Sequence, residues 1–351
     1  MREPVRVTDR QRFDTLIDAR TPAEFAIDHI PGAINCPTLT NEQRVIVGTL
    51  YKQVGSFEAK RVGGAMVAEN LARHLREVFA DKPANWKPLI YCWRGGLRSG
   101  SMTQWLRLVG WDAQQLPGGY KAWRRYVIDL IARVAPTLNL RVVVGATGSA
   151  KTSVLQALAA QGHQVIDLEG LACHKGSVLG NMPGQPQPSQ IRFETLISEA
   201  LESIDPSRPV FVEGESRKIG RLTVPEPLLA HMRASPCVEI DATPAARLAY
   251  LLRDYAYLGE DREQLSTKMG LLKDLHGKAV ISQWQDWALQ GQLAPLFEAL
   301  MTSHYDPHYA RSQSKNYVGW AARQSVATDD LTPTGIDLLA TAVAECVRPS
   351  T

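Results

Sequence analysis

The sequence predicts an α/β protein of two parallel-sheet domains, the second of which carries a helical extension. The chain has 351 residues, more than the ~250–300 residues at which a single hydrophobic core stops growing. Short apolar runs alternate with helical patterns in the first half, an order typical of a parallel sheet covered by helices. A new strand-like run begins near residue 140. We therefore predict domains at residues 1–135 and 136–351, with Pro136 near their boundary.

Apolar runs and turn residues define the elements of the first domain. The predicted elements are a buried strand (15–19), a short helix (21–28), a long helix (63–79), a strand (88–91), a helix (98–109) and, after a Pro-Gly-Gly turn (117–119), a further helix. Thr21 is placed as the N-cap of the short helix because its hydroxyl can accept from the first free backbone N–H groups.

The second domain repeats this alternation and then becomes helical. Its predicted strands are 140–144, 164–168, 209–213 and 238–241, with helices between them. Residues 260–301 have a helical pattern throughout, which predicts a helical subdomain at about 260–302. A loop rich in Gly and Pro at 180–189 is expected at the rim of a site.

Composition places the chain among ordinary globular proteins. Hydrophobic residues make up 44% and charged residues 21%. The first residues lack an apolar signal segment, and no uncharged apolar run reaches the ~18 residues of a membrane span. Five scattered cysteines show neither zinc-type spacing nor a disulfide framework. We therefore expect a protein of the reducing cytoplasm, without a membrane span.

Positive charge is concentrated in the first half. Residues 1–135 hold 20 Lys and Arg against 13 Asp and Glu, whereas the whole chain has a net charge of only +3. An anionic partner near the first domain is compatible with this excess, although similar imbalances occur on many soluble domains.

Cys92 is the strongest candidate for a catalytic residue. It lies between a predicted strand and a predicted helix, and Gly95 and Gly96 follow it. Backbone N–H groups and a helix N-terminus at such a loop favour an anion and lower the pKa of a thiol. Arg94 and Arg98 add positive charge. This combination predicts a thiolate nucleophile beside an anion-binding loop.

Two chemistries fit this loop. Its C-x5-R-S spacing occurs in cysteine phosphatases, where the thiolate attacks phosphorus and the arginine holds the phosphate. The alternative is transfer of a sulfur or selenium atom to the cysteine. Residues 18–20 (DAR), 29–35 (HIPGAIN) and 116–123 (LPGGYKAW) resemble the conserved segments of a rhodanese domain, so the second chemistry is favoured.

Residues 145–152 (GATGSAKT) predict a phosphate-binding P-loop, because they follow a strand and precede a helix. Lys151 and the loop amides would hold terminal phosphates, and Thr152 could bind Mg²⁺. Ala150 replaces the usual glycine, and we expect it to adopt helical torsions. Glu213 ends an apolar strand, as in a Walker B element. The candidate diphosphate ligands are Gly145, Thr147, Gly148, Ser149, Lys151 and Thr152.

The whole chain resembles the bacterial tRNA 2-selenouridine synthase family, in which a rhodanese-like domain is fused to a P-loop NTPase-like domain. Besides the two loops, the resemblance is carried by residues 41–53 (NEQRVIVGTLYKQ), 174–177 (HKGS), 187–190 (QPSQ), 213–220 (EGESRKIG) and 305–309 (YDPHY). Ala150 is a departure from the family pattern.

The resemblance implies an enzyme that acts on tRNA carrying 2-thiouridine at the wobble position. Sulfur would be replaced by selenium from selenophosphate, after a geranyl group from geranyl diphosphate has been placed on that sulfur. Cys92 would carry selenium as a selanylcysteine. No tightly bound cofactor and no metal site are implied, although Mg²⁺ could accompany the diphosphate.

The remaining assignments are inferences from this reading. Arg94, Gly95, Gly96 and Arg98 would bind selenophosphate, while the P-loop would bind geranyl diphosphate in preference to ATP. Arg217 and Lys218 could neutralise a departing pyrophosphate. Trp284 and Trp287 could stack on bases or line a prenyl groove, but core packing is the favoured role. The residues His304, Tyr305, His308 and Tyr309 could approach the RNA, and the sequence alone does not rank them.

Three rival functions remain open on the residues alone. A thiosulfate sulfurtransferase fused to a kinase-like domain would act without tRNA. A cysteine phosphatase would hydrolyse aryl phosphates through Cys92. An RNA-binding adaptor would not need the thiol at all.

Overall fold

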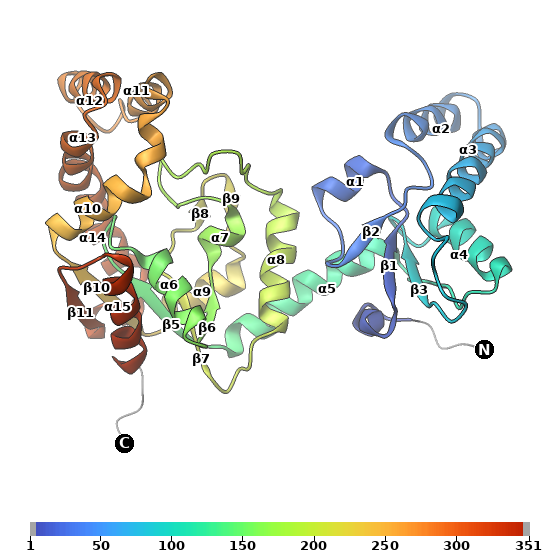
Figure 1. The fold of residues 1–351 in the computed structure, drawn as a ribbon, viewed down its shortest axis with the longest axis horizontal. Coiled ribbons are helices and arrows are strands. Elements are labelled where there is room, and N and C mark those ends of the chain that lie inside the picture. The colour runs from blue at the N-terminus through green and yellow to red at the C-terminus, as the bar shows by residue number, and fades with distance from the viewer. Residues whose placement is uncertain (1–4, 347–351) are drawn as a thin grey trace. The chain divides into compact units, whose positions relative to one another are not determined.

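The computed structural model describes residues 5–346, which divide into two compact units, each built around a parallel sheet. The first unit comprises Met1–Leu130 and Pro188–Glu199, and the second comprises Ile131–Gln187 and Ala200–Thr351. The α/β class predicted from the sequence is confirmed (Figure 1). The predicted domains at 1–135 and 136–351 stay a prediction, and the units differ from them by including residues 188–199 in the first.

The first unit contains a four-stranded sheet. Its elements are η1 (Val7–Arg12), β1 (Thr15–Asp18), α1 (Pro22–Ile27), β2 (Ala33–Asn35), α2 (Asn41–Gln53), α3 (Ser56–Glu77), β3 (Pro88–Tyr91), α4 (Leu97–Val109), β4 (Gln114–Gln115), α5 (Gly119–Val134) and the start of α8 (Gln190–Glu202). The strand order is β2-β1-β3-β4, with Leu16 opposite Leu89 on one side and Ala33 on the other, all parallel. Thr21 caps α1 as predicted, its hydroxyl accepting from the Glu24 N–H.

Helices α3 and α4 supply one face of the core in this unit. Leu71 of α3 and Met102 and Leu106 of α4 are buried against Ile17 and Ile90 of the central strands. Because β3 is a central strand with all four residues buried, its carboxyl end is held firmly. This end of the sheet carries Cys92.

Residues 188–199 join the first unit through a buried carboxylate, Asp28. The hydroxyls of Tyr120 and Thr195 donate to its Oδ2 at 2.7 Å and 3.0 Å. Arg192 lies 3.6 Å from its Oδ1. Burial raises the pKa of Asp28, although these hydrogen bonds and the nearby Arg124 oppose the rise. A buried acid with partners on three segments explains why α8 begins in this unit.

The second unit contains a five-stranded parallel sheet of order β11-β10-β5-β7-β6. Its elements are η2 (Ala135–Thr137), β5 (Asn139–Val144), α6 (Lys151–Ala160), β6 (Gln164–Ile166), α7 (Leu168–Ala172), the end of α8, β7 (Pro209–Glu213), β8 (Lys218–Ile219), β9 (Leu222–Thr223), α9 (Glu226–Ala234), β10 (Cys237–Ala242), α10 (Pro244–Asp254), η3 (Ala256–Gly259), α11 (Arg262–Gly270), α12 (Lys278–Gln290), α13 (Leu293–Leu300), η4 (Met301–Tyr305), α14 (Asp306–Asn316), η5 (Val318–Ala322), β11 (Gln324–Thr328) and α15 (Pro333–Cys346).

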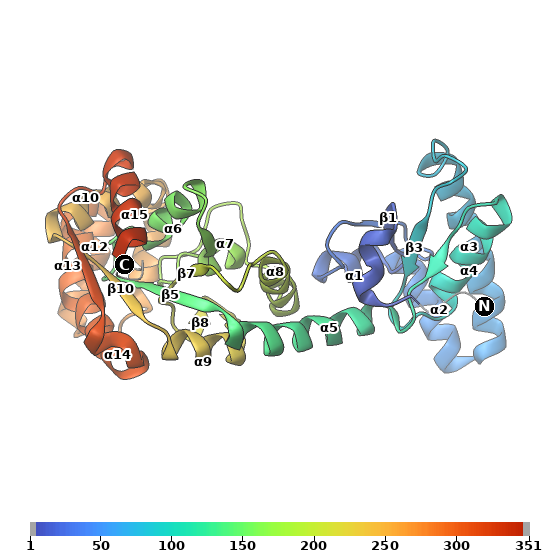
Figure 2. The same cartoon turned by 90° about the horizontal axis from the view of Figure 1, so that it is seen from below.

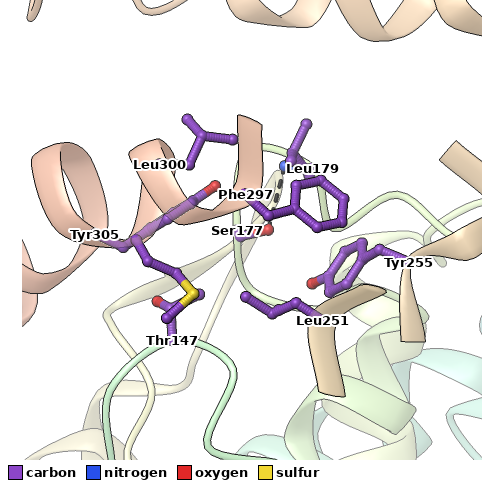
Figure 3. Close-up of a pocket in the computed structure, with 9 residues that line it drawn as sticks. Thr147, Ser177, Leu179, Leu251, Tyr255, Phe297, Leu300 and Tyr305 are labelled. Carbon is purple, nitrogen blue, oxygen red and sulfur yellow. Dashed lines mark hydrogen bonds between the residues drawn. The ribbon is translucent and has the colours of Figure 1, made fainter. Parts of the chain in front are cut away.

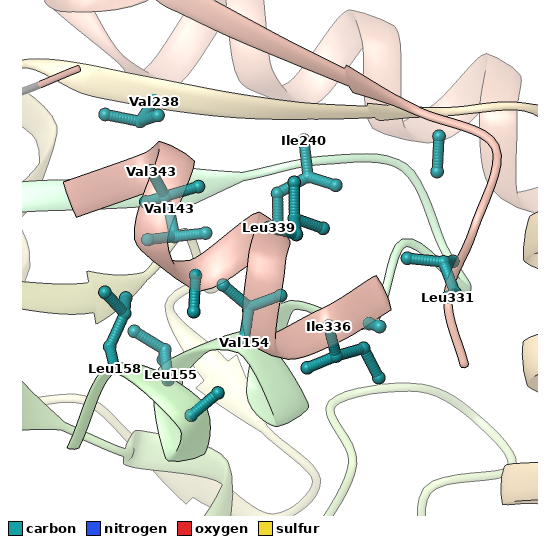
Figure 4. Packing of buried hydrophobic residues seen from close by; sticks show 14 of the residues in the cluster. Val143, Val154, Leu155, Leu158, Val238, Ile240, Leu331, Ile336, Leu339 and Val343 are labelled. Atoms are coloured by element: carbon teal, nitrogen blue, oxygen red, sulfur yellow. The ribbon is translucent and has the colours of Figure 1, made fainter. Parts of the chain in front are cut away.

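Two helices cover one face of this sheet. Val154 and Leu158 of α6 and Leu339 of α15 pack against Val143 of β5 and Ile240 of β10, as Figure 4 shows. Helix α9 lies on the opposite side of β5 (Figure 2). The strand β5 is therefore covered on both faces, and the loop after it begins from a fixed point.

The helical extension forms a separate core of α11, α12 and α13. The predicted pattern at 260–301 is interrupted, because a turn follows α11 and a short break precedes α13. Trp284 is 2% exposed in this core, so its favoured role in packing is confirmed, and Trp287 packs against the same cluster. Within the described range 5–346, no helix is both long and apolar enough to cross a membrane.

Candidate active sites

Cys92 directly follows β3, and two donors reach its sulfur. The backbone N–H of Gly96 donates to Cys92 Sγ at 3.3 Å, and the hydroxyl of Ser99 donates at 3.0 Å. Gln115 Nε2 in turn donates to Ser99 Oγ at 2.8 Å. Because Ser99 accepts from Gln115, its own proton is directed away from that amide and toward the sulfur. The arrangement stabilises negative charge on Sγ.

The donor set differs from the one expected from the sequence. Several main-chain N–H groups were expected around Sγ, but within residues 5–346 only that of Gly96 reaches it. Ser99 supplies the second donor, and sequence reasoning gave it no role. Cys92 is 3% exposed, so its thiol lies at the inner side of the loop.

The first turn of α5 holds the cysteine loop from behind. The N–H groups of Tyr120 and Lys121 donate to the carbonyls of Cys92 and Trp93 at 2.8 Å and 3.1 Å. A Cβ on Gly119, which has a φ of +53°, would lie 2.1 Å from the Cys92 carbonyl oxygen. This close approach requires glycine and explains the Gly-Gly pair before α5.

The two predicted arginines lie in different surroundings. Arg94 is exposed. Arg98 donates to both carboxylate oxygens of Glu24, at 2.6 Å and 3.3 Å. Burial alone would raise the pKa of Glu24, but the hydrogen bond and charge of Arg98 hold it below its ordinary value. Arg98 is therefore already paired with the Glu24 carboxylate when an anion reaches this loop.

Arg20, from the predicted 18–20 segment, forms a rigid support beneath the site. Its guanidinium contacts both Asp18 oxygens, the shortest contact being 2.6 Å, and donates to the Asp28 carbonyl at 2.7 Å. It also stacks on the ring of Tyr120, 3.9 Å from the ring centre. The quoted rhodanese-like residues thus connect β1, α1 and α5 within the first unit.

The phosphate loop lies between β5 and α6, and its polar groups contact other parts of the second unit. Lys151 Nζ donates to the Gly145 carbonyl at 2.8 Å, and Arg247 Nε donates to the Thr147 carbonyl at 2.8 Å. The Gly145 N–H donates to the hydroxyl of Tyr309. A bound phosphate would have to replace the contacts of Lys151 and Tyr309.

Ala150 is the point at which the prediction for this loop was wrong. It has a φ of +60° and a ψ of 27°, in the left-handed region. We expected helical torsions, but the loop needs a left-handed residue to lead into α6. An L-residue in this region costs roughly 1–2 kcal/mol. The fold therefore contains local strain where glycine would have none.

A group of carboxylates lies behind Lys151 and Thr152. Thr152 Oγ1 donates to Glu169 at 2.5 Å, and the Glu169 N–H donates to Glu213 Oε1 at 2.7 Å. Glu213 is fully buried, and among the described residues its Oε2 has no hydrogen-bond partner. Desolvation and the charge of Glu169 raise the pKa of Glu215 to about 8. The predicted Glu213 is thus at the loop, joined by Glu169 and Glu215, which the sequence analysis had not singled out.

Other predicted residues lie elsewhere or have protein partners. Arg217 is exposed and lies 3.8 Å from Glu226, and Lys218 is exposed at the start of β8. His304 is buried and is hydrogen-bonded to His276 at 3.0 Å. Tyr309, in the 305–309 segment, accepts a hydrogen bond from the Gly145 N–H, and Tyr305 lines a pocket with Thr147. Ser149 is buried, and among the described residues its hydroxyl has no hydrogen-bond partner.

Two pockets flank the phosphate loop. A polar pocket of about 290 Å³ is lined by residues that include Lys151, Thr152, Glu169, His174 and Lys175. A narrow apolar pocket of about 20 Å³ lies on the other side, and Tyr255 lines both. Figure 3 shows Leu179, Phe297 and Leu300 facing Thr147, Leu251 and Tyr255 across it. Charged and apolar surfaces therefore meet at the loop.

Oxygen ligands at the phosphate loop suit a hard cation. The Thr152 hydroxyl and the Glu169 carboxylate lie together, and oxygen donors are what Mg²⁺ prefers. Within residues 5–346 no group of three or more His, Cys, Asp or Glu is arranged to hold a metal ion. A cation here would consequently need phosphate oxygens to complete its shell.

Comparison with known proteins finds two family models that match successive parts of the chain. Residues 5–126 match the rhodanese-like domain model, and residues 138–270 match the tRNA 2-selenouridine synthase AAA domain model. A tRNA 2-selenouridine synthase of Cupriavidus pinatubonensis is 35% identical over 86% of this chain and 89% of its own length. That of Marinobacter nauticus is 34% identical over 84% of this chain and 87% of its own length.

For some relatives, the match spans less than two thirds of the relative's own length. The tRNA 2-selenouridine synthase of Nitrosomonas europaea is 39% identical over 68% of this chain, and the match spans 63% of its length. The solved structure of the N-terminal domain of a Clostridium difficile 630 protein is 38% identical, and the match covers 36% of this chain and 98% of that domain, with a TM-score of 0.32.

Proposed function

Because this chain belongs to the tRNA 2-selenouridine synthase family, we propose that it replaces sulfur by selenium at C2 of the wobble 2-thiouridine of tRNA. It does so in the cytoplasm, where its tRNA substrate is found. The reaction uses selenophosphate as the selenium source and geranyl diphosphate as the source of a temporary substituent on sulfur.

The observation that carries this proposal is the presence of two different anion loops on one chain. The first ends in a thiol whose sulfur receives an N–H and an O–H donor. The second is a P-loop flanked by one polar and one apolar pocket. A sulfurtransferase needs only the first and a kinase needs only the second. A selenium exchange that first alkylates sulfur uses both.

In the first unit, Cys92 delivers selenium to C2 at the selenide level: the P–Se bond of selenophosphate breaks, its phosphoryl group passes to water as phosphate, and geranylthiolate leaves C2 as the C–Se bond forms. The Gly96 N–H and the Ser99 hydroxyl stabilise the negative charge on Sγ. Arg94 and the Gly95 amide bind the selenophosphate oxygens, while the Gly96 N–H stays on the sulfur. Arg98 adds positive potential while its guanidinium holds Glu24.

In the second unit, the P-loop binds the diphosphate of geranyl diphosphate. The amides of Thr147 and Gly148 bind phosphate oxygens. Those of Gly145 and Ser149 join them after leaving the Tyr309 hydroxyl and the Ala146 carbonyl. Lys151 leaves the Gly145 carbonyl to neutralise the phosphates. Thr152 and Glu169 supply oxygen ligands when Mg²⁺ accompanies the diphosphate. Arg217 and Lys218 assist departure of pyrophosphate from the surface.

The geranyl chain enters the apolar pocket next to Thr147. Leu179, Leu251 and Phe297 present carbon atoms there, adjacent to the loop that holds the phosphates. The pocket holds about one water molecule in this structure. Side chains on α13 must therefore move apart to admit ten carbons, and burial of the chain compensates for that movement.

Alkylation of the sulfur explains why the two units act in sequence. A thioether at C2 leaves as a thiolate more readily than a thiocarbonyl sulfur does, and selenium at C2 then restores the pyrimidine. The second unit thus prepares the leaving group, and the first unit supplies the selenium that displaces it.

Mass spectrometry of nucleosides tests the proposal. The full chain is incubated with tRNA carrying 2-thiouridine, selenophosphate and geranyl diphosphate, and the RNA is then digested. We expect 2-selenouridine with both co-substrates and the geranylated nucleoside when selenophosphate is omitted. Unchanged 2-thiouridine under all conditions would contradict the proposed function.

A further inference from the structure

A large groove next to the cysteine loop has no role in the proposed chemistry so far. It has a volume of about 740 Å³, in the range of ligand sites. All of its lining residues belong to the first unit. They are Leu39, Arg44, Val47, Tyr51, Ala59, Lys60, Gly63, Gly64, Val67, Gly95, Gly96, Leu97, Arg98, Gly100, Ser101, Gln104 and Gln115.

The groove is lined in part by residues that also contact the thiol or its donor. Gly96 lines the groove and its N–H donates to Cys92 Sγ. Gln115 lines it too and donates to Ser99 Oγ, the second donor to the sulfur. A molecule in the groove therefore lies against the cysteine loop.

The lining residues suit a nucleotide that carries an apolar substituent. Val47, Val67 and Leu97 present carbon atoms. Three cations, Arg44, Lys60 and Arg98, are in the lining, which contains no Asp or Glu. Arg98 is paired with Glu24, whereas Arg44 and Lys60 form no ion pair with any residue in the described range. Selenophosphate needs positive charge but no apolar walls, so it does not account for this surface.

Helix α2, which with α3 forms one wall of the groove, exposes apolar side chains. Helix α2 has no buried residue, although it contains Val45, Ile46 and Tyr51. Exposed apolar groups on a helix of this length indicate a surface that another molecule covers. The same hairpin begins in the 41–53 segment, whose role the sequence did not reveal.

We propose that this groove is the acceptor subsite: it binds the S-geranylated wobble nucleotide in the tRNA anticodon loop while selenium is transferred. The inference rests on the proposed function and deepens it. The geranyl chain lies along Val47, Tyr51 and Val67, and the neighbouring phosphates meet Arg44 and Lys60. One geranyl group is consequently bound twice, first as a diphosphate in the second unit and then as a thioether in the first.

Binding of two anticodon stem-loop RNAs tests this subsite. One RNA carries 2-thiouridine and the other S-geranyl-2-thiouridine, and fluorescence anisotropy is measured without selenophosphate, so that no turnover occurs. We expect the full chain to prefer the geranylated RNA, and Tyr51→Ala to reduce that preference about tenfold. Lys60→Ala should weaken both RNAs alike, because it contacts phosphate.

The same hairpin provides matched controls. Tyr51 is 61% exposed and Phe57 78% exposed, but only Tyr51 lines the groove, so Phe57→Ala should keep the preference. Lys52→Ala is the corresponding control for Lys60→Ala. The exposure of Tyr51 also makes misfolding of its variant unexpected, and thermal unfolding checks this.

Three results would overturn the subsite. The preference could be the same in Tyr51→Ala and Phe57→Ala, or it could vanish in Leu300→Ala, which would place the geranyl group in the second unit. Sedimentation could also show a dimer that Tyr51→Ala dissociates, which would give the groove to a second copy. Failure of the proposed function is distinguishable, because the unaltered chain would then form no 2-selenouridine from geranylated RNA and selenophosphate.

Discussion

The cysteine loop and the phosphate loop have the same local architecture but different internal contacts. Each follows the carboxyl end of a central parallel strand and leads into a helix. In the cysteine loop, neighbouring residues donate to the reactive sulfur and stabilise its charged form. In the phosphate loop, Lys151 and the Gly145 N–H are engaged by a carbonyl and a tyrosine hydroxyl. A ligand must displace these contacts.

This difference matches what each loop has to do. In the cysteine loop the donors to Sγ are in place before any substrate arrives. In the proposed reaction the phosphate loop binds and releases a diphosphate, and its groups return to their protein partners afterwards. Protein partners also lower the energy of the empty loop, which weakens diphosphate binding and speeds product release.

The largest effect is expected at the phosphate loop. Lys151→Ala should lower the rate of geranylation by about 10²–10³-fold, because one charged group aimed at the diphosphate is lost. The measurement is formation of the geranylated nucleoside from thiolated tRNA. Lys273→Ala, an exposed lysine of the same unit, is the control and should react normally. Equal rates of geranylation in the two variants would show that Lys151 of the P-loop takes no part in the reaction.

A smaller effect is expected from the donor that the sequence analysis overlooked. Ser99→Ala should slow the alkylation of Cys92 by iodoacetamide at a fixed pH, and it should slow selenation about tenfold, since one hydrogen bond to the sulfur is lost. Thr103→Val is the control, because it removes another hydroxyl of α4, one that donates to the Ser99 carbonyl. An equal loss of rate in that control would mean that Ser99 acts only through the packing of α4.

The buried carboxylates predict a pH dependence of stability. The pKa of Glu215 is about 8 in the folded chain, above its ordinary value of 4.5, because of desolvation and the nearby Glu169. Between these values, unfolding releases a proton, so the free energy of unfolding falls as pH rises. Urea unfolding at both ends of this pH range should show that the free energy of unfolding falls less steeply with pH in Glu215→Gln than in the unaltered chain. An equal dependence on pH in the two chains would refute the raised pKa of Glu215.

The smallest effect concerns Ala150. Replacement by glycine should relieve roughly 1–2 kcal/mol of left-handed strain. It removes a buried methyl worth about 0.8 kcal/mol and adds about 0.5–1 kcal/mol of chain entropy to the unfolded state. The free energy of unfolding of Ala150→Gly should therefore change by less than about 1 kcal/mol, as measured by urea titration. A loss of several kcal/mol would contradict the strain argument.

Much of the fold followed from local pattern in the sequence. The strands Pro88–Tyr91 and Pro209–Glu213 were predicted with the bounds that the structure has, because apolar runs end there at a cysteine and a glutamate. The strands β2 and β4 were missed because three and two residues are too short to show a period. Strand β11 was missed because its residues are partly exposed and polar.

The site was predictable only as far as contacts are local. Cys92 and Lys151 were recognised from adjacent residues in their loops. The pairing of Arg98 with Glu24 joins residues 74 apart, and that of Gly145 with Tyr309 joins residues 164 apart. Such contacts form only when the chain folds, and the spacing of residues along the sequence does not predict them. The left-handed torsion of Ala150 likewise depends on how the loop closes onto α6.

Nucleoside analysis of the Cys92→Ser variant tests the division of labour between the two loops most directly. The variant is incubated with thiolated tRNA, geranyl diphosphate and selenophosphate. We predict that the geranylated nucleoside accumulates and that 2-selenouridine is absent, because the second unit works while the first cannot carry selenium. Formation of 2-selenouridine at the rate of the unaltered chain would contradict the assignment of Cys92.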